Sequence, residues 1–177
     1  MDIIEELKYY CNELQPVGAL MLTGEWGCGK TYLLNNILKD AIEDTHIILR
    51  VSLFGLESIE EVHKEVKKCW FYAFSESKES MSWMSETAKK FGKNIKSVVD
   101  GAKEFLPESI KTIADGVFSL DAIDFINIEP NMGNKKVVLV FDDLERANIS
   151  TNNLLGCIND YCENLHINTI VVANEEK

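Results

Sequence analysis

Eight residues near the amino terminus, GEWGCGKT at positions 24 to 31, combine three glycines with a lysine and a threonine. Gly24, Gly29, Lys30 and Thr31 occupy the fixed positions of the G-x-x-x-x-G-K-S/T pattern, the Walker A loop. Successive backbone N–H groups can reach a phosphate chain only where side chains leave room, and glycine leaves that room. The pattern therefore predicts a site for a nucleoside triphosphate rather than an ordinary glycine-rich turn.

The loop and the helix after it divide the predicted binding work. Lys30 supplies a mobile positive charge for the outer phosphates, and Thr31 offers a hydroxyl to a Mg²⁺ ion that bridges the same oxygens. The helix expected to begin near Lys30 directs its free N–H groups and its positive dipole end at the same anion. We take the whole segment as nucleotide-binding: Gly24, Glu25, Trp26, Gly27, Cys28, Gly29, Lys30, Thr31 and Tyr32.

Two side chains of this loop leave alternatives open. Trp26 could stack on a base, but a tryptophan in a loop more often packs down to anchor the loop, and we favour anchoring. Cys28 needs only its backbone N–H for phosphate binding. Its thiol, close to Lys30 and to a helix start, could be redox-sensitive, and we favour a small tolerated side chain.

A second group of candidate residues follows the apolar run at positions 137 to 141, where Asp142 and Asp143 come in succession. Hydrolysis of a nucleoside triphosphate needs a carboxylate for the magnesium shell and another group to orient water. Successive strand residues point to opposite faces, so the two acids cannot do the same work. We assign Asp142 to Mg²⁺, as in a Walker B strand, and Asp143 to the attacking water.

Three more polar residues lie near the ends of predicted strands. Glu145 could activate water in place of the shorter Asp143, and Arg146 could contact a phosphate or a neighbouring subunit; a solvated surface position is the alternative for both. Asn174 follows a late apolar strand, at the edge where open parallel sheets bind ligands, and could reach the terminal phosphate. A simple turn residue is the alternative there. The candidate catalytic residues are Lys30, Asp143, Glu145 and Asn174.

The apolar periodicity places these residues on an α/β scaffold. Short apolar or β-branched runs predict strands at 19–22, 46–54, 137–141 and 169–173. Helical spacing predicts four helices, with apolar faces at Ile3, Ile4, Leu7, Cys11 and Leu14; at Leu33, Leu34, Ile37, Leu38 and Ala41; at Ile59, Val62, Val66, Trp70 and Phe74; and at Leu154, Leu155, Ile158, Tyr161, Cys162 and Leu165. The third begins with a Ser58–Glu61 capping pattern and the fourth at Ser150 or Thr151.

Residues 76 to 130 interrupt the alternation of strands and helices. Their apolar residues follow a heptad-like spacing up to Pro107, and a second helical pattern comes after it. We predict a helical insertion. Packing of its apolar stripe on the parent domain, or on its own hairpin partner, is favoured over an intermolecular coiled coil.

Size and composition restrict the class of protein. A chain of 177 residues, 46% hydrophobic, predicts a single domain spanning residues 1–177. A net charge of -11 argues against a broad nucleic-acid surface. Five cysteines without paired or zinc-like spacing indicate neither a disulfide framework nor a structural zinc. Without a signal-like start or a long apolar run, the sequence predicts a cytoplasmic protein that does not enter the membrane.

Three segments together, GEWGCGKT, VSLFGLESIEEV and VVLVFDDLER, resemble the KAP family of P-loop NTPases over nearly the whole chain. The resemblance implies a three-layer, doubly wound P-loop core of the additional-strand, STAND/AAA-like class. In that core the TIVVAN strand lies between the strand before the phosphate loop and the acid-bearing strand. The resemblance also implies ATP as the nucleotide. Family members are similar to nucleotide-driven switches or assembly ATPases, and some bacterial ones are implicated in excluding phage.

The chain departs from the family pattern at three points. Many hydrolytic relatives carry glutamate where Asp143 stands, which implies slower turnover. Some members carry membrane helices in the insertion, whereas Lys, Glu and Asp recur through residues 76 to 130 here. The family fold normally continues with another strand and a carboxyl-terminal effector region, so we expect this chain, which ends at Lys177, to be a fragment.

The motifs predict a Mg²⁺-dependent nucleoside triphosphatase, and the family resemblance implies that it uses ATP, is slow or incomplete in this fragment, and is part of a bacterial anti-phage defence protein. The alternative is a non-hydrolysing regulatory or assembly module that binds nucleotide as a switch. A homo-oligomer that assembles through the insertion is a third hypothesis. A small-molecule phosphotransferase is weaker, because no acceptor site is recognisable.

Overall fold

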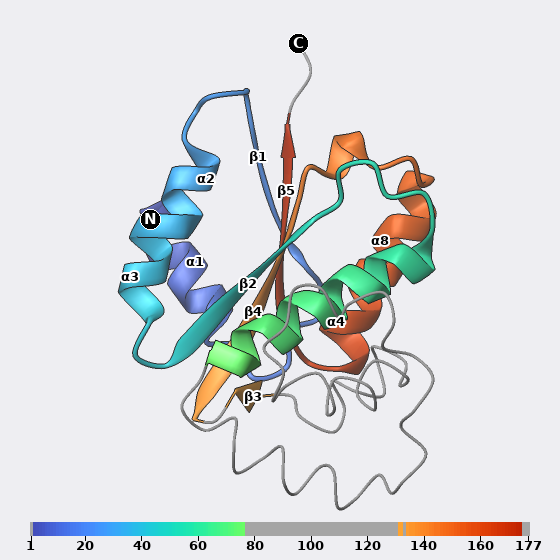
Figure 1. Cartoon of the computed structure of the whole chain (residues 1–177). Coiled ribbons are helices and arrows are strands. Elements are labelled where there is room, and N and C mark those ends of the chain that lie inside the picture. The colour runs from blue at the N-terminus through green and yellow to red at the C-terminus, as the bar shows by residue number, and fades with distance from the viewer. Residues whose placement is uncertain (1, 77–130, 133, 175–177) are drawn as a thin grey trace, which may run out of the picture.

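The computed structural model describes residues 2–76, 131–132 and 134–174, which form one β-sheet with helices on both faces (Figure 1). Four strands run parallel in the order β1-β5-β4-β2: β1 (Leu20–Gly24), β5 (Asn168–Asn174), β4 (Lys135–Asp142) and β2 (His46–Ser52). The two-residue strand β3 (Asn131–Met132) pairs antiparallel with the start of β4. The predicted insertion, apart from Glu76, lies outside the described residues.

The strand order determines which residues meet. β5, the last strand in sequence, lies between β1 and β4, as the family resemblance implied. Its pairing sets Gly24 opposite Asn174, and the pairing of β2 with β4 sets Ser52 opposite Asp142. All four residues end parallel strands, so the candidate site residues gather at one edge of the sheet.

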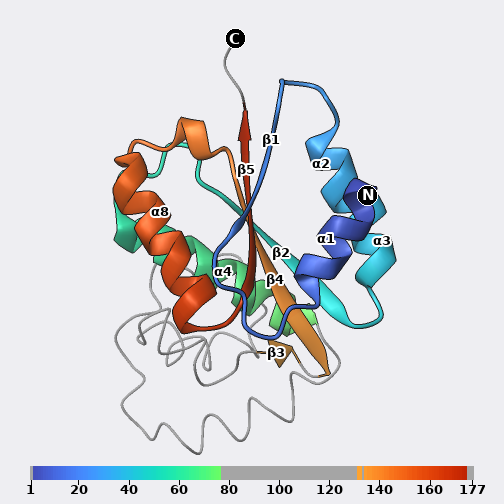
Figure 2. The same cartoon turned by 180° about the vertical axis from the view of Figure 1, so that it is seen from behind.

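The helices form two outer layers, seen from opposite sides in Figures 1 and 2. One face carries α1 (Ile3–Cys11) and a continuous helical segment made of α2 (Lys30–Tyr32), the π-helical turn η1 (Leu33–Leu38) and α3 (Lys39–Ile42). The other face carries α4 (Ile59–Glu76) and α8 (Thr151–Asn159), which continues into the π-helical turn η4 (Asp160–Asn164). The predicted three-layer α/β class is confirmed.

Side chains of β4 alternate between two hydrophobic clusters. Val137, Leu139 and Phe141 pack with residues of α4 and α8, whereas Val138 and Val140 pack with residues of α1, η1 and α3. Both faces of the strand are therefore buried. Burial on both faces explains the uninterrupted apolar run in its sequence.

The first helix is shorter than its apolar spacing predicted. It ends at Cys11, Leu14 is exposed, and Tyr10 takes the place of Ile3 in the buried face. The Tyr10 hydroxyl accepts a hydrogen bond from the Thr169 N–H at 2.9 Å. With its polar end paired, the ring can be buried, which a hydrophobicity pattern alone does not predict.

The predicted apolar face of the second helix is also corrected. Its buried residues are Leu34, Leu38 and Ile42, four positions apart, whereas Ile37 and Ala41 are exposed. The middle of this helix is π-helical, with hydrogen bonds from residue i to i+5. The wider turn rotates each residue less, so residues three apart, such as Leu34 and Ile37, no longer share one face.

Local turns and hydrogen bonds determine where β2 ends and where α4 and α8 begin. β2 ends at Ser52 rather than at 54, because the chain turns at Gly55, whose φ is 73°. Ser58 caps α4 by accepting from the Glu61 N–H at 3.2 Å, but the Glu61 carboxylate accepts from Glu57, not from Ser58. Ser150 caps α8, so of the two starts predicted for this helix, Ser150 is the cap.

None of the helices in the described part of the chain is both long and apolar enough to cross a membrane.

Candidate functional site

A cleft of about 490 Å³ opens at the carboxyl edge of the sheet. Its lining comes from the loop after β1, from α2 and η1, and from the ends of three strands. The lining residues are Trp26, Gly27, Gly29, Lys30, Thr31, Tyr32, Asn35, Asn36, Arg50, Asp142, Asp143, Val172 and Asn174. The two segments that the sequence singled out, about 110 residues apart, thus share one cavity.

The loop conformation explains two of its glycines. Gly27 and Gly29 have φ angles of 78° and 96°, in the left-handed region that side chains disfavour. A Cβ atom at either position would meet no heavy atom within 4 Å. The loop therefore needs glycine for its backbone angles, and the space above the glycines is free to admit a phosphate.

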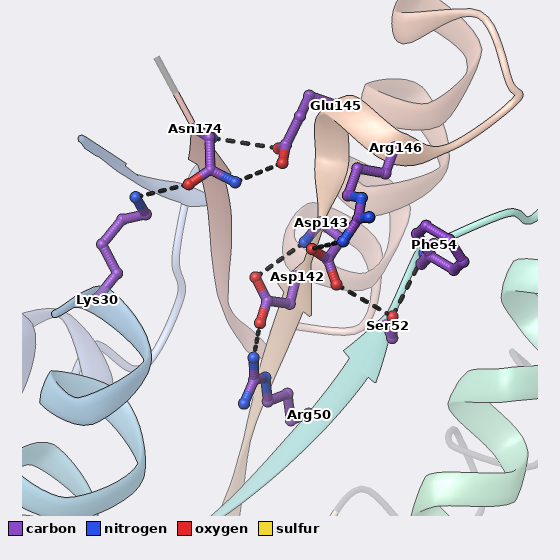
Figure 3. A network of polar contacts seen from close by, with 9 residues as sticks. All are labelled: Lys30, Arg50, Ser52, Phe54, Asp142, Asp143, Glu145, Arg146 and Asn174. Carbon is purple, nitrogen blue, oxygen red and sulfur yellow. Dashed lines mark hydrogen bonds and ion pairs between the residues drawn. The ribbon is translucent and has the colours of Figure 1, made fainter. Parts of the chain in front are cut away.

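Lys30 is held at the base of this loop. Its Nζ donates to the carbonyl oxygens of Gly24 at 2.7 Å and Glu25 at 3.0 Å, and to Oδ1 of Asn174 at 2.8 Å (Figure 3). The Cys28 Sγ lies 3.7 Å away. The ammonium group is thereby fixed between the glycine-rich loop and the end of β5.

The two aspartates have different partners. Asp142 is 7% exposed and forms an ion pair with Arg50, and its other carboxylate oxygen accepts from the Asp143 N–H at 2.9 Å (Figure 3). Asp143 has a left-handed backbone with φ of 61°; its carboxylate accepts from the Ser52 hydroxyl at 3.3 Å and lies 3.7 Å from Arg146. The two carboxylates therefore contact different groups, but the cause is the left-handed backbone of Asp143 after the end of β4 rather than alternation along the strand.

Glu145 and Asn174 form a pair beside the cleft. The Glu145 carboxylate accepts from both the backbone N–H and the side-chain amide of Asn174 (Figure 3). Desolvation raises the pKa of Glu145, but the hydrogen bonds from Asn174 and from its own backbone outweigh that effect and the pKa lies below its usual value. Glu145 is therefore a carboxylate at neutral pH.

The structure does not support the anchoring role that the sequence favoured for Trp26. Its side chain is 68% exposed and lines the cleft rather than packing into the core. The Arg146 guanidinium lies over the rings of both Trp26, at 5.4 Å, and Phe54, at 4.3 Å. The contact with Arg146 is thus what links the tip of the loop to the acidic segment, through cation–π attraction.

Four predicted site residues do not line the cleft. Gly24 and Glu25 turn their carbonyl groups to Lys30, and the Cys28 N–H donates to the Glu25 carbonyl at 3.3 Å. Glu145 is turned to Asn174. Arg146, named only as a further candidate, also lies outside the cleft lining. The other predicted residues line the cleft together, and their separate roles in binding, metal coordination and catalysis stay predictions.

Sequence reasoning missed Arg50, Asn35, Asn36 and Val172. Arg50 had a signal, because it is the one charged residue in the apolar stretch 46–54. Asn35 and Asn36 lie one turn beyond Thr31 on the same helical segment. No motif marks them, and only the fold shows that this turn faces the cleft.

The residues present fit a magnesium nucleotide. Mg²⁺ prefers carboxylate, hydroxyl and phosphate oxygens, and the cleft offers Asp142 and Thr31. The space over Gly27 and Gly29 and the charge of Lys30 suit an anionic phosphate chain.

A match to a family model agrees with this geometry. The model of the KAP family P-loop domain matches residues 1–177. No curated protein matches the chain. Among solved structures, one described as the structure of a DnaB-like replicative helicase and its interactions with primase is similar, with 14% identity and a TM-score of 0.42. The match covers 93% of this chain and 41% of that one. The family match and the cleft identify a nucleotide-binding P-loop NTPase domain, and the chain belongs to the KAP family.

Proposed function

We propose that this domain binds ATP together with Mg²⁺ and hydrolyses it. The proposal is carried by one observation: Lys30 and Thr31, together with Asp142 about 110 residues later in the sequence, line a single cleft beside glycines with free space above them. Bound Mg²⁺ would supply charge neutralisation for the phosphates. The choice of ATP over GTP rests on the family resemblance and is tested by competition between the two nucleotides.

Within that function each residue has a distinct part. Thr31 and Asp142 would hold the metal. Lys30 would give up its hydrogen bonds to oxygens of the chain, bind phosphate oxygens instead, and so neutralise the outer phosphates. Asn174 positions Lys30 and Glu145 with respect to each other. Asp143 or Glu145 would accept the proton of the attacking water, and both are near the end of β4.

The binding test compares two lysines of the same helical segment. Lys30→Ala should weaken ATP binding in Mg²⁺ by at least about tenfold, because a charge-assisted contact to phosphate is lost. Lys39→Ala removes the same charge from an exposed position outside the cleft and should bind as the native chain does. Calorimetric titration gives both dissociation constants. Equal affinity in Lys30→Ala and the native chain would refute nucleotide binding at this site.

The hydrolysis test uses Asp143→Asn and Glu145→Gln. The variant that removes the general base should lower kcat by roughly 10²-fold or more while ATP affinity stays within a few-fold. The other variant should retain most of the activity. Phosphate release under multiple turnover measures kcat. If neither substitution changes it, water is activated by neither acid.

A nucleotide switch without hydrolysis is the second candidate function, and the contacts of the acids favour it. Asp143 is held by Ser52 and Arg146, and Glu145 is held by Asn174. Both carboxylates therefore already have partners within the chain, and these contacts compete with the orientation of an attacking water. A native chain that binds ATP tightly but shows no multiple turnover would establish the switch. Light scattering with and without ATP would show whether the switch drives formation of a homo-oligomer.

We further propose that the domain acts in bacterial defence against phage, a role supported only by what the family resemblance implies. Phage should form fewer plaques on a bacterial host that expresses the protein than on one that expresses its Lys30→Ala variant. Equal plaque counts for the two would refute a nucleotide-dependent role in defence.

A further inference from the structure

Arg50 occupies an unexpected position for a site that is to hold a metal ion. It lies in β2 opposite Val140, two residues before Ser52, which is opposite Asp142. Residues two apart on a strand share a face, so the Arg50 side chain lies on the same side of the sheet as Asp142. It reaches along the sheet to that carboxylate and also lines the cleft (Figure 3).

Both oxygens of the Asp142 carboxylate are engaged within the chain. Oδ2 bonds Arg50, and Oδ1 accepts from the Asp143 backbone. The backbone contact is local and leaves lone pairs free, whereas the guanidinium contact brings a full positive charge. A divalent cation at Asp142 would meet that charge at close range, and two cations beside one carboxylate repel each other.

The environment of the Arg50–Asp142 ion pair favours replacement of Arg50 by another cation over loss of any cation from Asp142. The Asp142 side chain is nearly buried, so leaving its charge unpaired would be costly. The Arg50 side chain is 36% exposed, so its guanidinium can return to water when another cation takes its place. Arginine keeps its charge at any ordinary pH, so only a competing cation or movement of the side chain releases Asp142.

We propose that Arg50 and Mg²⁺ compete for Asp142, so that Arg50 balances the carboxylate without metal and sets how much metal the nucleotide-binding site requires. The inference rests on the proposed function and adds a regulatory step to it. Arg50 is in this sense a positioning residue, because it acts on the metal through Asp142.

The test measures how strongly Mg²⁺ enhances nucleotide binding. The probe is an ATP analogue with an imido bridge between its β and γ phosphates, titrated once in EDTA and once in excess Mg²⁺. The ratio of the two dissociation constants is the metal enhancement. In Arg50→Met the enhancement should rise by about tenfold, within the usual range of coupling between sites, because the competing cation is gone.

Two further variants make the result specific. In an Asp142→Asn background, Arg50→Met should change the metal enhancement by less than about twofold, because no carboxylate remains to compete for. Lys39→Met removes a positive charge from an exposed position outside the cleft and should leave the enhancement near its native value. An enhancement in Arg50→Met that is unchanged or lower, or that rises equally in Lys39→Met, would overturn the proposal.

A measurement on the native chain covers the case in which Arg50→Met does not fold. The chain has two arginines, so its spectrum should contain two guanidinium Nε–H signals, and Arg146→Lys assigns them. With the analogue present, added Mg²⁺ should shift the Arg50 signal more than that of Arg146. A fixed Arg50 signal, while Mg²⁺ strengthens binding, would overturn the competition. Absence of nucleotide binding by the native chain would refute the proposed function and this inference together.

Discussion

At the scale of single residues, Asn174 connects the two halves of the site. Its Oδ1 accepts from Lys30, while its amide group and its backbone N–H donate to Glu145 (Figure 3). The amide can make these contacts at once because it has a donor and an acceptor at the same end. A change at Asn174 should therefore affect the orientation of catalytic groups more than the binding of phosphate.

We expect Asn174→Ala to lower kcat for ATP by roughly 10²-fold, the scale for loss of one oriented polar contact in an active site. The dissociation constant for ATP should change by less than about threefold. Asn36→Ala is the control, because Asn36 also lines the cleft but lies on the helix. Steady-state kinetics and titration give the two quantities. A loss of affinity as large as the loss of kcat would contradict a positioning role.

His46 predicts a pH dependence of stability. The Nε2 of its buried ring donates to the Cys11 carbonyl at 2.9 Å, and Nδ1 lies 2.8 Å from the Thr45 hydroxyl. Burial lowers the pKa of His46 below its usual 6.5. The unfolded chain then binds more protons, so the contribution to stability is full above about pH 6.5 and is lost as pH falls through the folded pKa.

The expected result is a fall in the free energy of unfolding on going from pH 7.5 to pH 5 that is smaller in His46→Gln than in the native chain. Urea denaturation at each pH measures it. His166→Asn serves as the control, because His166 is exposed and Asn tolerates its left-handed backbone. The same pH dependence in all three proteins would show that His46 is not responsible.

At the scale of elements, the site depends on how strand ends and loops are tied together. The Leu53 N–H donates to the Asp142 carbonyl at 2.9 Å, and the Gly55 N–H donates to the Arg146 carbonyl at 3.0 Å. These bonds extend the pairing of β2 with β4 beyond the ends of the two strands. The Arg146 guanidinium lies over the Phe54 ring in the same region. The acidic segment is therefore held by backbone contacts as well as by its side chains.

The cap of α8 gives a prediction at this scale. Ser150→Ala removes the acceptor for the Asn153 N–H and should lower the free energy of unfolding by about 1 kcal/mol. Thr151→Ala, at the exposed first position of the helix, should change it by less than about 0.5 kcal/mol. Urea denaturation of both variants measures the difference. Equal effects would mean that the Ser150 hydroxyl does not cap the helix in solution.

At the scale of the whole molecule, ligand binding should stabilise the folded chain, because the cleft joins the loop after β1 to three other strands. ATP with Mg²⁺ at about 100 times its dissociation constant should add about 2.7 kcal/mol to the free energy of unfolding. For a chain of this size this corresponds to roughly 5–10 °C in Tm. Lys30→Ala should show little shift at the same concentration, and Lys39→Ala the full shift. A shift that Lys30→Ala retains would place the nucleotide elsewhere.

The sequence by itself determined the elements and the chemistry of the loop. Glycines followed by Lys30 and Thr31, between an apolar run and a helical period, require a particular turn, and the buried run before Asp142 can only be an interior strand. These are local patterns, because backbone angles and the alternation of side chains depend on near neighbours. They were sufficient for the fold class and for most of the cleft lining.

Only the tertiary structure decided which groups meet. Arg50 and Asp142 pair although they lie 92 positions apart, and the contacts of Trp26 and Phe54 with Arg146 join three separate segments of the chain. The burial of Tyr10, and the turn of Glu145 to Asn174 rather than into the cleft, likewise depend on partners distant in sequence. The physical reason is that a side chain's role follows from its nearest partners, and strand order, which no local pattern encodes, selects those partners.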